Sequence, residues 1–298
     1  MHFFGKDLPV FKAALHNHSK VSDGQYTPQE VIKLYADKGF DVFAFTDHRK
    51  TNPIDTYDSC NMTLISGIEL HPDGPRGSIW HLLALNVPQD FPGEFATAQE
   101  AVDAVNGVNG IIFCAHPAWC GITSRDIAEL NGLAGIEVYN SSCRYIGKDN
   151  SETIWNELTD MHIIYPALAV DDTHSAAELF GAWTMIAAAD RRPETIMQAL
   201  KDGSFYATQG PEFTRLSFQD GIFEAEFSEV EEAILIGEKA SGYTLCQVGV
   251  PSYGDYRLTT SLRQDINKRR WPEKVHFRCR IKDARGRYAW SPVFKYCE

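Results

Sequence analysis

Two successive patterns of apolar residues constrain the fold of this chain. From about residue 10 to residue 205, short apolar segments with β-strand character alternate with amphipathic segments of helical periodicity. Strands joined through helices run parallel, and about seven of them in succession indicate a closed barrel. The expected strands cover residues 10–15, 42–45, 64–68, 79–85, 111–114, 136–138 and 163–170, and the expected helices cover residues 28–38, 98–105, 124–130, 151–158 and 193–201.

The clearest helix signal lies at residues 28–38. Thr27 and Glu30 have the spacing of a capping box, in which each side chain bonds the backbone of the other residue. Pro28 occupies the first helical position, and Gly39 stands where a helix stop is expected. These signals predict where the first helix begins and ends.

The pattern changes after Gly210 and Pro211, because the later strands follow one another without helices between them. This arrangement is typical of a small antiparallel β-sandwich. We therefore divide the chain into an α/β domain at residues 1–210 and an all-β domain at residues 211–298. The expected strands of the second domain cover residues 215–218, 222–227, 233–236, 243–247, 275–282 and 293–296.

Composition excludes several functional classes. The chain has 28 Lys and Arg against 40 Asp and Glu, a net charge of −12, which disfavours nonspecific binding to nucleic acid or anionic membranes. The longest apolar run, residues 163–170, is far too short to span a membrane. Lys6 and Asp7 interrupt the one candidate signal segment, and none of the seven cysteines forms a Cys-x-x-Cys pair. We expect a reduced, cytoplasmic protein.

Side chains with metal-ligand chemistry gather at the ends of the predicted strands. His16 and His18 end the first strand, and the period of two in a strand points both imidazoles to the same side. In a closed barrel the strand ends meet at one rim, where such enzymes place their chemistry. Six of the ten histidines and three carboxylates follow this pattern, so we predict a metal site formed by His16, His18, Asp23, His48, Glu69, His81, His116, Asp172 and His174.

The number of ligands predicts more than one ion. Nine donors exceed the four to six positions of a single ion, so two or three divalent ions are expected. Imidazole mixed with carboxylate, without thiolate, favours Zn, Mn or Fe over Mg or Ca. Clustered ions of this kind generate hydroxide from a bridging water and hold the oxygens of a phosphoryl group during its displacement.

These residues resemble the motifs of the PHP family, the polymerase and histidinol phosphatase domain. The matching motifs are His16-x-His18 with Ser22-Asp23-Gly24, Thr46-Asp47-His48, Gly67-Ile68-Glu69 with His81, His116, and Asp172-x-His174. The resemblance covers about residues 13–210 and implies a distorted seven-stranded (β/α)7 TIM-like barrel with a trinuclear metal centre. It places one ion between His16, His18, Glu69 and Asp172, a second between Glu69, His81 and His116, and a third between Asp23, His48 and His174.

The remainder of the chain resembles one branch of that family. Residues 203–211 are similar to the segment that leaves the barrel in stand-alone PHP phosphoesterases, and residues 283–291 are similar to the closing hairpin of their C-terminal sandwich. This branch includes the CehA/McbA-like metallohydrolases, some of which cleave carbamate esters. Only 55 residues separate His116 from Asp172, so no large cap domain is expected over the site.

Four residues near the expected rim are candidate substrate or outer-sphere contacts. Asp47 precedes a ligand and is placed either to orient His48 or simply in a turn. His71 would act as a general acid or competing ligand, although the turn that follows it favours an exposed position. Asn140 and Arg144 lie just past a strand end, where an arginine fork suits phosphate. Arg49 and Arg76 are also close to the predicted rim loops, but each is expected to be a surface residue, and His2, His162 and His276 are expected to be structural.

The sequence thus favours a metal-dependent phosphoesterase acting on a small phosphorylated molecule, monoester or diester, through a metal-bridging hydroxide. Two alternatives stay open: a carbamate or ester hydrolase of the same fold, and a non-catalytic module that holds metal while the sandwich binds a partner. An apolar pocket without a basic rim would favour the ester hydrolase. A nucleic-acid substrate is expected only as a nucleotide or short oligonucleotide, because the chain is acidic.

Overall fold

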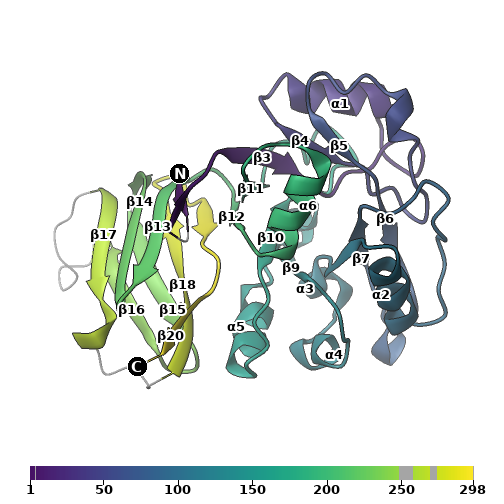
Figure 1. The fold of residues 1–298 in the computed structure, drawn as a ribbon. Coiled ribbons are helices and arrows are strands. Elements are labelled where there is room, and N and C mark those ends of the chain that lie inside the picture. Colours follow the sequence, from purple (N-terminus) through teal and green to yellow (C-terminus); the bar gives the residue numbers. More distant parts are fainter. Residues whose placement is uncertain (4, 248–257, 269–273, 298) are drawn as a thin grey trace.

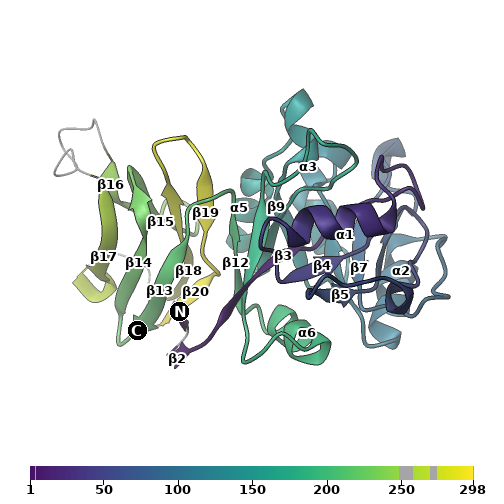
Figure 2. The same ribbon diagram turned by 90° about the horizontal axis from the view of Figure 1, so that it is seen from above.

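The computed structural model describes residues 1–3, 5–247, 258–268 and 274–297. Within them the chain is a mixed α/β fold with six α-helices and many strands. Figure 1 shows a helical half (residues 10–208) beside a strand-rich half (residues 2–7 and 213–297). Both ends of the chain lie at the strand-rich half, as the view from above in Figure 2 also shows.

The helical half is built on two arrays of five strands. One is the sheet in the order β10-β9-β8-β7-β6, and the other is β12-β11-β3-β4-β5, which belongs to a ten-stranded sheet. Buried apolar side chains such as Leu15, Phe113, Leu168 and Phe205 fill the space that the strands enclose. The strands are β3 (Val10–Ala14), β4 (Val42–Ala44), β5 (Thr63–Ile65), β6 (Gly67–Leu70), β7 (Leu82–Leu85), β8 (Ile111–Cys114), β9 (Gly135–Asn140), β10 (Ala167–Val170), β11 (Trp183–Ala187) and β12 (Phe205–Thr208).

Isolated bridges connect the two arrays. Asn17 bridges Thr173, and His48 bridges Glu69, both in parallel. β3, β4 and β5 run parallel, as do β8, β9 and β10, but β7 is antiparallel to both of its neighbours. The expectation of parallel strands throughout is therefore wrong at β7, because residues 71–81 turn the chain back without an α-helix.

Other expected strands differ in extent. Residues 64–68 are split at Ser66 between β5 and β6, which belong to different sheets. His81 lies directly before β7 rather than inside a strand, and the segment at 163–170 is a strand only from Ala167. β11 and β12 were not expected as strands. They pair antiparallel to each other, and β11 pairs antiparallel to β3, so the chain reverses twice before leaving this half.

The helices follow the expected local signals closely. The capping box of Thr27 and Glu30 is confirmed, and Thr97 and Thr123 begin two further helices in the same way. One short helix, α3, was not expected, and its N-cap is His116. The bounds are α1 (Pro28–Ala36), α2 (Ala98–Gly107), α3 (Pro117–Cys120), α4 (Ser124–Ala128), α5 (Glu152–Asp160) and α6 (Pro193–Lys201).

Two facing sheets form the strand-rich half, in the orders β17-β14-β13-β1-β2 and β16-β15-β18-β19 with β20 beside β18. Phe223, Leu235 and Phe277 belong to the core between them. The N-terminal β1 pairs in parallel with β13, so the chain begins in this half. The strands are β1 (His2–Phe3), β2 (Lys6–Asp7), β13 (Phe213–Gln219), β14 (Ile222–Val230), β15 (Glu232–Gly237), β16 (Gly242–Gln247), β17 (Thr259–Asp265), β18 (Lys274–Lys282), β19 (Tyr288–Trp290) and β20 (Phe294–Cys297).

The ten-stranded sheet continues from one half into the other. β12 pairs with β19, through Ala207 opposite Trp290 and Thr208 opposite Ala289. The Trp290 ring also stacks on Tyr139 of β9 at a centroid distance of 6.3 Å. Among the described residues, every helix is too short or too polar to cross a membrane.

Candidate metal centre

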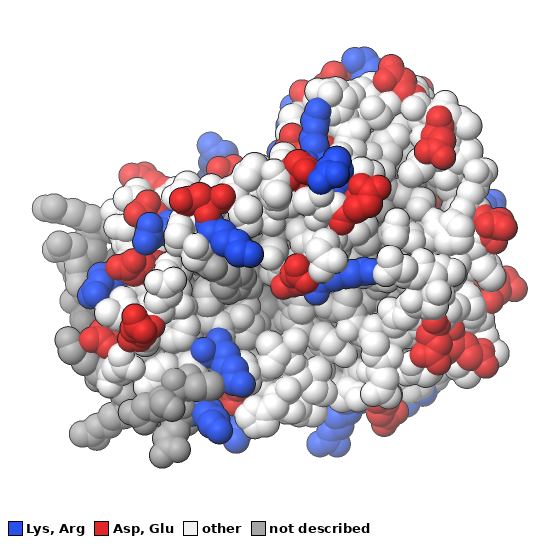
Figure 3. Space-filling view, in the orientation of Figure 1, with Lys and Arg blue, Asp and Glu red and all other residues white. Residues whose placement is uncertain are grey.

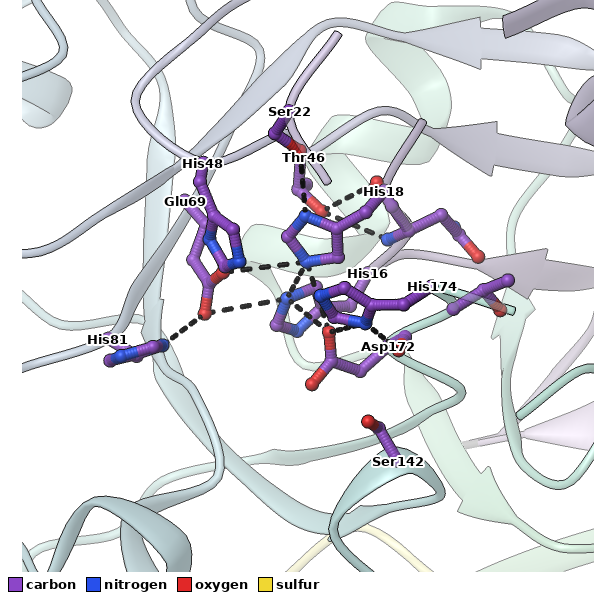
Figure 4. Close-up of polar contacts among 12 residues, drawn as sticks. His16, His18, Ser22, Thr46, His48, Glu69, His81, Ser142, Asp172 and His174 are labelled. Atoms are coloured by element: carbon purple, nitrogen blue, oxygen red, sulfur yellow. Dashed lines mark hydrogen bonds and ion pairs between the residues drawn. The ribbon is translucent and has the colours of Figure 1, made fainter. Parts of the chain in front are cut away.

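Nine side chains with metal-ligand chemistry converge at one end of the helical half. Figure 4 shows many of them pointing toward one another from the ends of separate strands. Two of them, His16 and His18, are almost completely buried. The others line a cavity of about 320 Å³ whose described lining is Asp23, His48, Glu69, His81, His116, Trp119, Ser142, Cys143, Asp172 and His174.

The deepest group joins the ends of β3, β6 and β10. Asp172 Oδ1 lies 3.2 Å from His16 Nε2 and 3.0 Å from His18 Nε2, and these two nitrogens lie 3.2 Å apart. The Glu69 carboxylate lies 3.5 Å from each of the two nitrogens. Donors that share one ion at about 2.1 Å are themselves roughly 3–4 Å apart. The four side chains therefore have the spacing of ligands around one ion.

Glu69 connects this group to the next one. Its Oε1 lies 2.8 Å from His81 Nδ1 and 3.2 Å from His116 Nε2. His81 reaches the site because β7 is antiparallel to β6 and β8, so the start of β7 lies at the same rim as the ends of those two strands. His116 follows β8 directly. The Glu69 carboxylate therefore contacts both groups of histidines.

A third group lies nearer to solvent. Asp23 Oδ2 lies 3.3 Å from His48 Nε2, and Asp23 Oδ1 lies 3.6 Å from His174 Nε2. The His18 ring is stacked on the His174 ring at a centroid distance of 4.2 Å. Ligand atoms of these four residues all lie within 4.8 Å of one another, which makes this group a possible metal site.

Glu137 is a functional candidate that the sequence analysis missed. It is fully buried on β9, and its Oε1 accepts a 2.7 Å hydrogen bond from His16 Nδ1. Its Oε2 accepts from the backbone N–H of His116 at 2.9 Å and from Asn140 Nδ2 at 3.0 Å. The proton on Nδ1 of His16 leaves Nε2 to face the cluster, which is how carboxylates orient metal-binding imidazoles.

Two of the nine donors have strained backbones. His116 has φ of 23° and Asp172 has φ of 55°, in a region that residues with a side chain rarely adopt. Such conformations cost about 1–3 kcal/mol each and persist where the surroundings hold them. The His116 N–H is bonded to Glu137, and the Asp172 N–H donates to the carbonyl of His16 at 3.0 Å. Both strained positions place a donor in the cluster.

The buried carboxylates strongly perturb the histidines. Burial by itself would lower the pKa of His16, but the charges of Asp172, Glu137 and Glu69 raise it well above its ordinary value. Burial also opposes the charged form of His48, yet the carboxylates of Asp23 and Glu69 raise its pKa to about 10. His18 behaves differently, because burial outweighs its neighbours and lowers its pKa to about 4. The carboxylates of the cluster therefore favour nearby positive charge, but burial keeps His18 from supplying it.

Atoms without partners indicate how that charge is supplied. Glu69 Oε2 and Asp172 Oδ1 are buried and have no hydrogen-bond partner, although imidazole nitrogens lie within 2.7–3.2 Å of them. An unsatisfied buried carboxylate oxygen is costly. A divalent cation between these oxygens and the facing nitrogens would satisfy both kinds of atom. The residues therefore fit metal ions, with imidazole and carboxylate as the donor set.

Comparison with known proteins agrees with this geometry. Residues 14–109 match the family model of the PHP domain. The matched segment holds His16, His18, Asp23, His48, Glu69 and His81, and the other three donors follow it in the chain. A search of curated proteins finds no match to the chain.

Solved structures are similar to this chain at low sequence identity. A two-domain protein from Bacteroides vulgatus, described as containing a predicted PHP-like metal-dependent phosphoesterase, is 14% identical with a TM-score of 0.54, covering 99% of this chain and 98% of its own. An amidohydrolase from Chromobacterium violaceum, with sulfate and no metal, is 18% identical with a TM-score of 0.48 over 64% of this chain and 96% of its own. A lesion-specific endonuclease from Pyrococcus furiosus is 18% identical with a TM-score of 0.47 over 65% and 56%.

None of the four tentative contacts is among the described residues that line the cavity. The Asp47 carboxylate accepts bonds from the loop at residues 19–22 and from Asn52, so it fixes that loop and does not orient His48. Asn140 is buried and donates to Glu137 and Asp172 rather than facing a substrate. The Arg144 guanidinium is engaged by Ser141, Tyr145 and the carbonyl of Ala177, so it is not free to bind phosphate.

His71 lies in the cluster, so its expected exposed position is wrong. Its side chain is only 12% exposed, with Nε2 2.8 Å from His48 Nδ1 and 3.6 Å from Glu69 Oε2. The sequence analysis also missed Cys120, whose Sγ lies 3.4 Å from His116 Nδ1. A cysteine in an unexpected one-turn helix gives no signal of such a contact.

The remaining basic residues and histidines have local partners. Arg76 pairs with Asp126 at 2.7 Å, and the exposed Arg49 lies 3.9 Å from Glu94. His2 pairs with Asp7, while His162 and His276 both lie against Glu238. Cys114 is buried within the core of the helical half. These side chains lie outside the metal-donor cluster.

Proposed function

We propose that this chain is a metal-dependent hydrolase whose main substrates are phosphoric esters of small molecules. The observation that carries the proposal is the convergence of nine donors, seven of them lining one cavity, and two of the nine having buried oxygens that lack partners. We assign two or three Zn, Mn or Fe ions, held by the three groups described above, with Glu69 as the bridge. When bound, such ions lower the pKa of water and neutralise charge on the oxygens of the scissile group.

The proposal gives the side chains of the cavity distinct tasks. Asp23, Glu69 and Asp172 place three carboxylates in the lining, next to His48, whose pKa Asp23 and Glu69 raise. Cations held between these groups would add the positive charge that a phosphate needs, so substrate binding is expected to depend on metal. Glu137 orients His16, and Asn140 holds Asp172 by a 3.1 Å hydrogen bond. These two contacts keep the donors in place without touching the substrate.

The size of the cavity and the surface charge favour a small substrate. A volume of about 320 Å³ lies at the lower end of the range for small-molecule sites. On the face shown in Figure 3, basic side chains are scattered among acidic ones rather than gathered into a continuous area. Long nucleic acids require such a basic area. A nucleotide or short oligonucleotide remains compatible with the site.

Hydrolysis assays after manganese loading test the proposal. The substrates are p-nitrophenyl phosphate, bis-p-nitrophenyl phosphate and p-nitrophenyl acetate, and the metal content of each preparation is measured in parallel. We expect a phosphate ester to be preferred and the activity to vanish in Asp172→Ala. Asp103→Ala is the matched control, because Asp103 is exposed on α2 and belongs to no donor group. Normal turnover by metal-free Asp172→Ala would refute the proposal.

One observation favours an ester or carbamate hydrolase as the second candidate. No Lys or Arg is among the described residues lining the cavity, and Trp119 and Cys143 give it an apolar part. A phosphate would then be neutralised by cations and imidazoles alone. Preference for the acetate in the same assay would select this candidate. Silence on all three substrates with full metal content would favour the non-catalytic module.

We also propose a division of labour along the chain. Residues 1–210 would form the catalytic part as a distorted (β/α)7 barrel, apart from β1 and β2, which pair in the other half. Residues 211–298 would form the β-sandwich domain. A fragment of residues 8–210 that binds metal and hydrolyses the substrate would support this division.

A further inference from the structure

One wall of the cavity is aromatic. The Trp119 side chain lines it and is 41% exposed, unusual for so large an apolar residue. Its ring centroid lies 5.2 Å from that of His81 and 5.3 Å from that of His116, edge to face with both. One part of the indole therefore packs against two metal donors. Another part is open to whatever occupies the cavity.

The chain fixes the position of this ring through the same turn that positions a donor. α3 starts directly after His116, and the Trp119 N–H donates to the carbonyl of His116 at 2.9 Å. The Trp119 carbonyl accepts a 3.5 Å contact from Lys148 Nζ, which links α3 to the loop after the 3-10 helix Ser142–Ile146. These contacts hold the backbone of Trp119, and the packing of its ring on His81 and His116 places the indole beside the donor groups, as a specificity wall requires.

The charge of the lining indicates what kind of group this wall contacts. Away from the donors, the described lining consists of Trp119, Ser142 and Cys143, which carry no formal charge. Arg144, the nearest arginine along the 3-10 helix, is held by its own loop. A charged substituent would find no counter-charge there. A flat apolar group would bury its surface against the indole.

We propose that Trp119 is a specificity-determining residue that binds an aryl group attached to the scissile bond. The substrates of this site are then esters of aromatic alcohols rather than short alkyl esters. The inference rests on the proposed hydrolytic function and deepens it, and it applies to phosphoric and carboxylic esters alike. Trp119 acts by stacking on the substrate and takes no part in proton transfer.

Kinetics of the manganese-loaded protein test this inference through variants at one position. kcat/KM is measured for p-nitrophenyl phosphate and for ethyl phosphate, and each variant is divided by wild type so that the intrinsic reactivity of the two substrates cancels. Trp119→Ala should lose about tenfold on the aryl substrate and less than about twofold on ethyl phosphate. Trp119→Phe, which keeps a flat ring, should retain most of the selectivity, whereas Trp119→Leu should not.

A matched control separates stacking from general apolar effects. Ile146 is 62% exposed at the end of the same 3-10 helix that supplies Ser142, but it does not line the cavity. Ile146→Ala should leave both substrates unchanged. An equal loss on the two substrates in Trp119→Ala, or no loss on either, would overturn the inference. If Trp119→Ala does not fold, Trp119→Leu against Trp119→Phe decides the same question.

A binding measurement separates this inference from the proposed function. Phenylphosphonate and methylphosphonate are titrated into the manganese-loaded protein, and indole fluorescence is compared between wild type and Trp119→Phe. Tighter binding of phenylphosphonate, with a fluorescence change that disappears in the variant, supports the inference even if no ester is hydrolysed. Inactivity toward every ester would count against the proposed function alone. Equal affinity for the two phosphonates would overturn the inference.

Discussion

Two buried glutamates have their negative charge balanced by different kinds of side chain. Glu69 lies at the metal-donor cluster and is surrounded by imidazoles, with one oxygen left without a hydrogen-bond partner. Glu152 begins α5 at the junction of the two halves and is surrounded by guanidinium groups. Its Oε1 lies 3.0 Å from Arg278 Nη2 and its Oε2 lies 2.8 Å from Arg280 Nη1. Both oxygens of Glu152 are satisfied.

The unpartnered atoms differ in kind between the two places. At the junction they are donors, Arg278 Nε and Arg280 Nε, whereas in the cluster they are the acceptors Glu69 Oε2 and Asp172 Oδ1. The Arg278 guanidinium also stacks over Trp155 at 4.1 Å. At the junction, the permanently charged guanidinium groups of Arg278 and Arg280 therefore balance the charge of Glu152. The described lining of the cluster has no Lys or Arg to supply such charge, and this makes the cluster suited to metal ions.

The largest expected effect comes from Glu69→Gln. The amide keeps the shape of the side chain but removes the charge that bridges two donor groups, so at least one ion should be lost. Hydrolysis should fall by more than the ten- to hundredfold typical of residues behind the ligands. Metal analysis and kcat/KM measure both effects. Glu152→Gln is the matched control, and it should change neither quantity.

A smaller effect is expected from Glu137→Gln. The amide can still contact His16 but no longer attracts the proton on Nδ1, so metal affinity should drop by about ten- to hundredfold. Titration with Co²⁺, followed by its visible spectrum, measures the affinity and reports changes in ligand geometry. Unchanged affinity with a lower thermal stability would mean that Glu137 is only structural.

Arg278→Met tests the junction with an effect on stability alone. The variant leaves Glu152 with a single guanidinium, so the free energy of unfolding should fall by roughly 2 kcal/mol, less than the 3–5 kcal/mol of a fully broken buried pair. Urea denaturation gives this value. Metal content and kcat/KM should match wild type, and a loss of metal would show that the junction and the cluster are coupled.

The pH dependence of the junction is the smallest expected effect. Burial would raise the pKa of Glu152, but the charges of Arg278 and Arg280 hold that pKa below its ordinary value of 4.5. A lowered pKa in the folded protein means that the stabilisation is complete above pH 4.5 and is lost as the pH falls through the folded value. The difference in unfolding free energy between wild type and Glu152→Gln should be constant from pH 7 to pH 5 and shrink at lower pH. A constant difference down to pH 3 would contradict this.

Local signals in the sequence were sufficient for most elements. The capping box at Thr27 lies within four consecutive residues, and α6 has the expected bounds because Pro193 begins a clear apolar period. Directions and partners of strands depend on distant residues. The reversal at β7 and the pairing of β1 with β13 depend on which sheet edges are available for pairing. No local sequence pattern contains that information.

The metal donors could be predicted from the sequence, but the residues that hold these donors in place could not. His16 and His18 are two residues apart just past the end of β3, where the strand period of two predicts a common direction. Glu137 lies in β9 among mostly apolar residues, and no nearby sequence pattern predicts its 2.7 Å contact with His16, a residue 121 positions away. Arg144 was predicted to contact the substrate, but its guanidinium is hydrogen-bonded within its own loop.

The sequence by itself determined the order of the main elements, the change from α/β to all-β character near residue 210, and the set of residues with metal-ligand chemistry. These depend on spacing along the chain. Only the tertiary structure decided that His71 joins the cluster, that Asn140 and Glu137 stand behind it, and that Trp119 forms a wall of the cavity. Such placements depend on how separate strands and turns meet in space, and short-range periodicity contains no information about those distances.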